Sequence, residues 1–316
     1  MAWYAGNVRR FAIGLALLAA SGARAADNDL ELWRLGHPND IRVCTVCDGT
    51  DTTVEPGNIF AQRRFARFTA TLGLAFAPPF HEQAHTTGEA GFEVGVSGAV
   101  AFPKVAPDEW PTEASVAAFP APKVLVLPTI TVRKGLGASV ELGAAVSYLA
   151  ASQMVGLTAQ LRWAPLDGLA RAPDVALRLW GTRVVGTREL DLVVGGADLA
   201  ISKSFALGGA AQVQPYAQYG IAFINAMSST VDFHPTTENF RTPNDDDSVF
   251  RTISFFDNRY HHAVVGLRIV SGMFLVGVEG SLAMGTNAIQ RDAIAGGVPT
   301  QFTRVWSAAG RIGVSY

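Results

Sequence analysis

Charged residues are scarce in this sequence of 316 residues. They make up 16% of the chain, whereas soluble domains usually contain about 25%. The formal net charge of -2 argues against a nucleic-acid partner, which would call for clustered basic residues, so we expect no such partner. Only two cysteines are present, which excludes a disulfide-rich scaffold. What the chain has in abundance is hydrophobic residues (49%) and glycine (32 residues).

The N-terminus is typical of a secretory signal peptide. Arg9 and Arg10 precede an apolar run over residues 11–20, and a small-x-small cleavage site ends at Ala25. The run is too short for a membrane-spanning helix, which needs about 20 residues, and no later apolar run reaches that length. We therefore predict a signal peptide over residues 1–25, cleaved near Ala25, and an exported mature chain.

The C-terminal segment, residues 302–316, alternates between two faces and stops on an aromatic residue. One face carries apolar residues such as Trp306 and Ile312, and the other carries polar residues such as Ser307 and Arg311. This pattern resembles the closing strand of bacterial outer-membrane β-barrels. The resemblance implies that the barrel assembly machinery reads the strand ending at Tyr316, and that outer-membrane lipid and lipopolysaccharide surround the protein.

Ten segments alternate with the period of a strand, and each is about as long as a barrel strand. They cover residues 91–102, 123–133, 138–150, 154–164, 174–185, 189–202, 207–224, 258–270, 274–284 and 302–316. The even number agrees with bacterial single-chain barrels. We predict an all-β, transmembrane antiparallel β-barrel of about 10 strands, with 12 as the alternative, over residues 88–316. Pro128 predicts a local bulge or weak point, and a change of phase at Gly195-Gly196 predicts a second bulge.

The connections between these segments are of two kinds. Counting back from the C-terminus places short turns at residues 134–137, 165–173, 203–206 and 271–272 on one side, and long connections at 103–122, 225–257 and 285–301 on the other. Short periplasmic turns and long outer loops are typical of outer-membrane barrels. The segments 132–136 and 201–205 also resemble those of uncharacterised outer-membrane barrel proteins of proteobacteria, which supply no functional residues to carry over.

Residues 26–87 precede the barrel. Within them, residues 60–76 alternate as a strand would, but Phe65, Phe68, Leu72 and Phe76 also recur at helical spacing. Because an extra strand would make the count odd, we expect a helix, in a periplasmic or lumen-plugging extension. Cys44 and Cys47 lie in an otherwise irregular part, where we expect them to form a small structural disulfide.

The inward faces of the predicted strands mix both signs of charge. The candidate lumen-lining residues are Glu93, Glu141, Gln160, Arg162, Arg178, Gln212, Gln214, Gln218, Arg268, Glu279 and Arg311, together with Arg133 and Asp191. In a narrow barrel such charges are expected to pair with one another. The alternative is a conduction path with electrostatic selectivity. A wide general porin is not expected, because ten strands leave little room between side chains.

The function predicted from these features is a narrow channel or solute-binding barrel in the outer membrane. The alternative is a structural or surface-interaction barrel that acts through its long outer loops. A hydrolase using His261 or His262 with Ser228, Ser229 or Ser248 is a remote third reading, because no nucleophile signature supports it. We expect no catalytic residues, no cofactor and no metal. The acidic run over residues 245–247 lacks the spaced ligands of a calcium loop.

Overall fold

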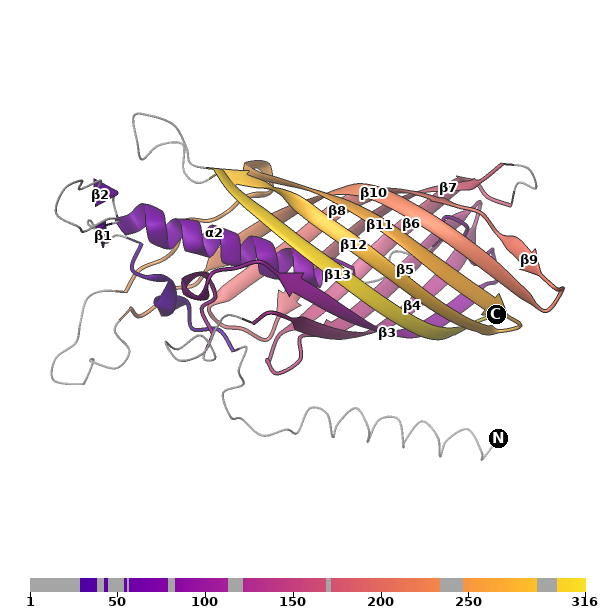
Figure 1. Ribbon diagram of the computed structural model, residues 1–316, viewed down its shortest axis with the longest axis horizontal. Coiled ribbons are helices and arrows are strands. Elements are labelled where there is room, and N and C mark those ends of the chain that lie inside the picture. The colour runs from indigo at the N-terminus through magenta and orange to yellow at the C-terminus, as the bar shows by residue number, and fades with distance from the viewer. Residues whose placement is uncertain are drawn as a thin grey trace, which may run out of the picture.

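The computed structural model describes residues 29–38, 43–44, 54–55, 57–78, 83–112, 122–168, 172–233, 247–288 and 300–316. Ten long strands pair antiparallel with their neighbours along the chain, and the last pairs with the first, so the sheet closes on itself. This confirms the predicted ten-stranded antiparallel barrel (Figure 1). No helix among the described residues is both long and apolar enough to span a membrane.

The wall consists of β3 (Phe92–Pro103), β4 (Leu125–Gly137), β5 (Val140–Tyr148), β6 (Val155–Leu166), β7 (Asp174–Val185), β8 (Leu190–Ser202), β10 (Ala211–Ser228), β11 (Asn258–Ser271), β12 (Phe274–Ala288) and β13 (Thr300–Ser315). A short strand, β9 (Phe205–Leu207), forms a hairpin with the start of β10. The ring closes between β13 and β3, where Phe92 and Tyr316 exchange two backbone hydrogen bonds of 2.8 and 2.9 Å.

Side chains along the strands alternate between buried and exposed, as the period of two predicts. The exposed positions form an apolar outer surface that includes Val96, Leu142, Leu179, Trp306 and Ile312. A soluble protein rarely exposes so large an apolar area, and lipid is the medium in which such a surface is stable. The barrel is therefore a transmembrane one.

The barrel has two unlike ends. At the end that we call the turn end lie the C-terminus and the short connections β4–β5, β6–β7, β8–β10 and β11–β12. The other end, which we call the loop end, holds the long connections 104–124, 229–257 and 289–299. Figure 1 shows the C-terminus and β9 at the turn end. The predicted asymmetry of loop length is thus present.

Both predicted bulges are wrong. β8 pairs in unbroken register with β7 and β10 through Gly195 and Gly196. Pro128 pairs in register with Gly98 of β3. Its missing N–H removes no hydrogen bond to β5, because the β4–β5 ladder begins only at Thr129. The irregularity in β4 lies instead between Gly135 and Gly137, beside the turn.

The unbroken register of β8 also corrects the prediction for Asp191, which we expected inside the barrel. Asp191 is exposed on the outer surface, where it pairs with Arg183 at 3.1 Å. The inward positions at this end of β8 are Leu190, Leu192 and Val194, all buried. Apolar residues point inward here because a helix, rather than water, occupies the lumen.

That helix is α2 (Gly57–Phe76), which confirms the helical reading of residues 60–76. Figure 1 shows α2 running from beyond the loop end into the barrel. Before it come the short 3-10 helix η1 (Leu32–Leu35) and a two-stranded ribbon of β1 (Val43–Cys44) and β2 (Val54–Glu55). Residues 1–25, Cys47 and the acidic residues Asp245 and Asp246 lie outside the described residues, so the signal peptide and the disulfide remain predictions.

Candidate functional site

The lumen is the candidate site, and its loop-end half is apolar. Phe65, Phe68, Leu72 and Phe76 of α2 share one face and are all fully buried, and Ala70 and Leu74 on the opposite face are buried too. A helix that is apolar all round is stable only when it is enclosed. Each of these large side chains contributes about 1.5–3 kcal/mol when it is removed from water, so the wall and the helix stabilise each other.

Two glycines let the helix approach the wall. A Cβ on Gly73 of α2 would lie 2.9 Å from Ile224 and 3.1 Å from Val194, which face it from β10 and β8. A Cβ on Gly156 of β6 would lie 2.7 Å from the ring of Phe76. Neither position has room for a larger residue, so α2 is closely packed against three strands.

Polar contacts fix the outer part of α2. The Gln62 side chain donates to the carbonyl of Arg251 and accepts from its N–H, both at 2.9 Å. Asn287 at the end of β12 donates to the carbonyl of Ala66 at 3.2 Å. The ring of Phe65 stacks on that of Phe250 at 4.7 Å between centroids. The loop end is therefore closed by contacts from both the wall and the connection between β10 and β11.

Residues 83–91, which we call the crossing segment, continue the chain to the turn end. Ala84 donates its N–H to the Ser202 hydroxyl at 2.9 Å, and Thr86 donates to Asp167 through both N–H and hydroxyl at 3.1 and 2.8 Å. The N–H of Thr87 donates to Glu141 at 3.0 Å. The crossing segment thus fills the turn-end half of the lumen and leads to β3.

A cluster of charged side chains surrounds the crossing segment. Glu93 on β3 lies 2.5 Å from Arg133, 2.8 Å from Arg268 and 2.7 Å from Arg311. All four side chains are buried. A carboxylate shared by three guanidinium groups satisfies several buried charges at once, which is the condition for tolerating buried charges.

Glu141 on β5 extends this cluster. Its carboxylate accepts from Arg133 at 2.9 Å and lies 3.5 Å from Arg162. Arg162 also donates to the carbonyl of Gln83 in the crossing segment at 3.1 Å. Because the same carboxylate holds Thr87, the ion pairs of the wall and the crossing segment form one network.

A second group centres on Asp198, which we did not predict. Arg178 of β7 donates to this carboxylate from Nε at 2.7 Å, and His262 Nε2 lies 2.6 Å from it. Gly220 lies between Asp198 and His262 in the sheet, and any side chain there would fill the space in which they meet. Counting back in steps of two from the inward positions Ser202 and Ala200 places Asp198 inside the barrel.

The other predicted lining residues lie nearby. Glu279 accepts from the Tyr216 hydroxyl at 2.8 Å, Gln160 accepts from Arg178 at 3.4 Å, and Gln214 donates to Gln212 at 3.3 Å. Gln218 is buried on the same inward face of β10 as Gln214. Five arginines and five carboxylates of the wall are buried in the lumen: Arg133, Arg162, Arg178, Arg268 and Arg311, and Glu93, Glu141, Asp174, Asp198 and Glu279.

At the turn end the lumen opens into a cavity of about 360 Å³. It is lined by His85 of the crossing segment, Asp167, Lys203, Gln212 and Gln214, among others. Burial, and secondarily the positive charge of Arg268, lowers the pKa of His85 from 6.5 to about 4, against the opposing effect of Asp167. His85 is therefore neutral at neutral pH, which adds no charge to a lumen rich in arginine.

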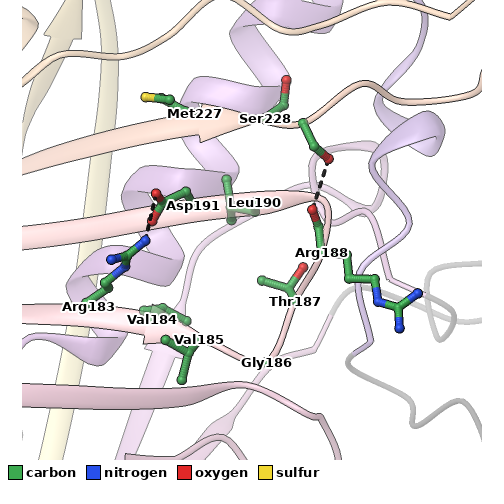
Figure 2. Close-up of a pocket in the computed structure, with 11 residues that line it drawn as sticks. Arg183, Val184, Val185, Gly186, Thr187, Arg188, Leu190, Asp191, Met227 and Ser228 are labelled. Atoms are coloured by element: carbon green, nitrogen blue, oxygen red, sulfur yellow. Dashed lines mark hydrogen bonds and ion pairs between the residues drawn. The ribbon is translucent and has the colours of Figure 1, made fainter.

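A second hollow lies at the loop end, where the β7–β8 hairpin meets the end of β10 (Figure 2). Its volume is also about 360 Å³. In Figure 2 Arg183 and Asp191 point toward each other, and the guanidinium of Arg188 points away from them. The Ser229 hydroxyl donates to the carbonyl of Arg188 at 3.0 Å. These side chains do not converge on a common point, so the hollow has no arrangement suited to catalysis.

The structure does not assemble the remote hydrolase reading. His261 points outward and hydrogen-bonds Tyr219 at 2.7 Å, whereas His262 points into the lumen. His262 pairs with Gly220, and Ser228 lies eight residues further along β10 (228 minus 220), about 26 Å away at the rise of a strand. Ser229 and Ser248 lie beyond the end of β10. Among the described residues, no group of three or more His, Cys, Asp or Glu could hold a metal ion.

Comparison with known proteins finds proteins of similar structure but none of similar sequence. No family model matches the sequence, and no curated protein does. The chain is similar to the N-terminal β-barrel domain of Pseudomonas aeruginosa OprF (11% identity, 72% of this chain and 99% of that chain, TM-score 0.28). It is similar to Neisserial surface protein A, NspA (13%, 72% and 99%, 0.27), and to the outer membrane protein OprG from Pseudomonas aeruginosa (9%, 73% and 98%, 0.29).

These likenesses concern the fold alone. The closed strand pairing and the apolar outer surface independently show a transmembrane barrel. The chain thus has the architecture of an integral outer-membrane β-barrel.

Proposed function

We propose that this protein acts in the outer membrane through the surface at its loop end, as a structural or interaction barrel whose lumen is closed by its own N-terminal segment. The observation that supports this proposal is that described residues ahead of β3 occupy both halves of the lumen. Helix α2 fills the loop-end half, and the crossing segment with its ion pairs fills the turn-end half. An exported chain, with a signal peptide cleaved near Ala25, is part of the proposal.

Conduction through this arrangement is unfavourable for a physical reason. An ion entering from the turn end would meet charges that are already paired, and it would have to displace the crossing segment from Glu141 and Asp167. Further in it would meet the buried apolar face between Leu72 and the wall. A desolvated ion in such surroundings has no compensating partners.

The loop end offers the surface that the lumen does not. In outer-membrane barrels the short turns face the periplasm and the long loops face outside. On this orientation the three long connections, together with residues 29–38, face the exterior of the cell. Exposed connections on a rigid scaffold are where recognition usually resides.

A narrow channel, the function that the sequence favoured, is the second candidate. The observation in its favour is that α2 is covalently joined to the wall only through the crossing segment, so the helix could leave the lumen as a unit. The lumen would then be lined by side chains of both signs, as in pores whose selectivity is electrostatic.

Planar-bilayer recording of the purified full chain tests the proposal. We expect an electrically silent barrel from the full chain. Discrete openings of the full chain, with a selectivity that changes in Arg162→Gln or Glu141→Gln, would replace the interaction function by transport. A variant lacking residues 26–76 is the companion measurement, and silence from it too would remove the channel candidate.

Contact with lipid at the loop end belongs to the same proposal. Arg304 stacks over the ring of Trp306 at 4.8 Å on the outer surface of β13, and Arg183 and Arg259 are exposed near the same end. Arginine and tryptophan at the end of an apolar band are typical of a membrane interface. We propose that these residues face the headgroups of the outer leaflet, where lipopolysaccharide phosphates are available.

A further inference from the structure

We infer that the barrel carries its own N-terminus through the lumen to the outer face, so that any polypeptide ahead of Asp29 is displayed on the cell surface. The inference rests on the orientation used in the proposed function, but it holds whether or not the barrel conducts. It assigns a further activity to the fold, namely export and display of the chain that precedes α2.

The course of the chain is the first step. β3 begins at the turn end, where Phe92 is hydrogen-bonded to the C-terminal Tyr316. Going backward from Phe92, the crossing segment contacts Glu141, Asp167 and Ser202, which all lie at the turn end of their strands or in the β6–β7 turn. Continuing backward, Phe76 contacts Gly156 near the loop end. The chain therefore traverses the whole lumen before the wall begins.

The second step is the position of the residues ahead of α2. Leu30 forms a β-bridge with Thr112, and the N–H of Glu31 donates to the carbonyl of Pro111 at 2.8 Å. Asp29 accepts from Gln153 through both its N–H (3.0 Å) and its side chain (3.2 Å). Three connections of the loop end thus hold this stretch, because the N–H of Leu32 also donates to Glu189 in the β7–β8 turn at 2.7 Å.

The third step is closure. The ring of strands is complete, with β13 paired to β3 and β10 to β11. A segment inside a closed ring either passed through it end first or had the ring close around it. Both routes leave the N-terminal end at the loop end, on the side opposite to Phe92.

Withdrawal of α2 to the turn end would be costly. The inward residues Leu192, Val194 and Ile224, all buried against the helix, would then line a water-filled lumen. The contacts of Asp29, Leu30 and Leu32 with the loop-end connections would be lost as well. The apolar inward residues of this half of the wall therefore favour the position of α2 inside the lumen.

Single cysteines at the two ends of the segment test the inference in the full chain. In a Cys44→Ser/Cys47→Ser background, Asp29→Cys, at a half-buried position, reports on the loop end, and Glu89→Cys, at an exposed position, reports on the turn end. Intact cells are treated with a membrane-impermeant maleimide. We expect Asp29→Cys to be labelled at least tenfold more than Glu89→Cys, and both to be labelled equally after lysis. Labelling of Glu89→Cys alone in intact cells, or of neither until lysis, would overturn the inference.

An epitope insertion provides the second measurement, scored only on barrels that migrate faster on unboiled gels. The epitope is placed between Asn28 and Asp29, with a matched insertion at Gly208-Gly209, a turn-end position with open space around it, and a loop-end insertion after Phe233. We expect antibody to stain the first and third on intact cells and the second only after permeabilisation. If intact cells stain with the insertion that follows Phe233 but not with the insertion that precedes Asp29, display is refuted. If intact cells stain only with the insertion at Gly208-Gly209, the orientation is refuted.

Discussion

The ring of Phe76 occupies the space that a side chain on Gly156 would need, with only 2.7 Å between its Cδ1 atom and an ideal Cβ at that position. Phe76 ends α2, and Gly156 lies near the loop-end start of β6. This contact marks how deep the helix reaches into the barrel. It also makes the docking of α2 open to a test by substitution in the wall.

We expect Gly156→Leu to displace α2 without preventing barrel assembly. Overpacking costs about 1–3 kcal/mol, so trypsin should cleave at Arg63, Arg64 or Arg67 of α2 roughly ten-fold faster or more than in the unmodified protein. Gly310→Leu is the matched control, because a Cβ there meets nothing within 4 Å. Equal cleavage in the two variants would show that the helix does not depend on this contact.

Glu93→Gln should strongly destabilise the barrel. The substitution removes the negative charge shared by Arg133, Arg268 and Arg311, and breaking a buried ion pair costs about 3–5 kcal/mol. The measurement is the denaturant midpoint in detergent micelles. Asp191→Asn is the control, since its exposed pair with Arg183 is expected to contribute under about 1 kcal/mol. Similar midpoints for both variants would contradict the assigned role of Glu93.

Much of this fold was predictable because a strand wall exposed to lipid obeys one simple rule. Along β13, Trp306 and Ile312 face lipid and Arg311 faces the lumen, as the period of two indicates. The same rule failed in β8, where Leu190, Leu192 and Val194 point inward. The rule assumes a polar lumen, and α2 makes this half of the lumen apolar.

The helix in the lumen also caused one charged residue to be misplaced. Reading Leu192 and Val194 as lipid-facing turned Asp191 inward and forced a change of phase at Gly195-Gly196. Periodicity cannot show where α2 lies, because Ala70 and Leu74 stand opposite the stripe of Phe65, Phe68 and Leu72, so no polar face marks one side of the helix for solvent. The contacts of the crossing segment depend on tertiary structure alone.

Acidification should loosen the crossing segment. His85 has a pKa of about 4 in the folded protein and 6.5 when unfolded, so the unfolded state binds the proton more tightly. The stability that neutral His85 contributes is present above about pH 6.5 and is lost as the pH falls toward 4, reaching about 3 kcal/mol. Hydrogen exchange of the Thr86 and Thr87 amides should therefore accelerate over this window.

His85→Gln is the control for that pH dependence. Glutamine does not titrate, so the exchange of the same amides should vary much less between pH 6.5 and 4. If the exchange of these amides depends on pH in His85→Gln as it does in the unmodified protein, His85 is not the titrating group.

Cys44 and Cys47 should be oxidised to each other in the exported protein, with little effect on the barrel. A loop this short restricts few unfolded conformations, so the stabilisation should be well below the ~3 kcal/mol of a loop of about 15 residues. Mass spectrometry with and without reductant tests the link. A Cys44→Ser/Cys47→Ser variant should keep the denaturant midpoint of the unmodified barrel, and a bound metal or covalent cofactor at the thiols would refute the disulfide.

Removal of Tyr316 should lower the yield of assembled barrel. The residue closes the ring at the turn end through two backbone hydrogen bonds with Phe92, and its side chain is the terminal aromatic of the closing strand. Deletion removes both features, whereas Tyr316→Ala keeps the backbone pair and loses only the ring. Tyr316→Phe keeps both and should assemble normally. The readout is the fraction of protein in the fast-migrating form on unboiled gels. If Tyr316→Ala assembles as poorly as the deletion, the aromatic ring is the feature that assembly needs, as recognition by the assembly machinery requires. If Tyr316→Ala assembles normally, only the hydrogen bonds to Phe92 contribute. Normal assembly of the deletion would refute both roles.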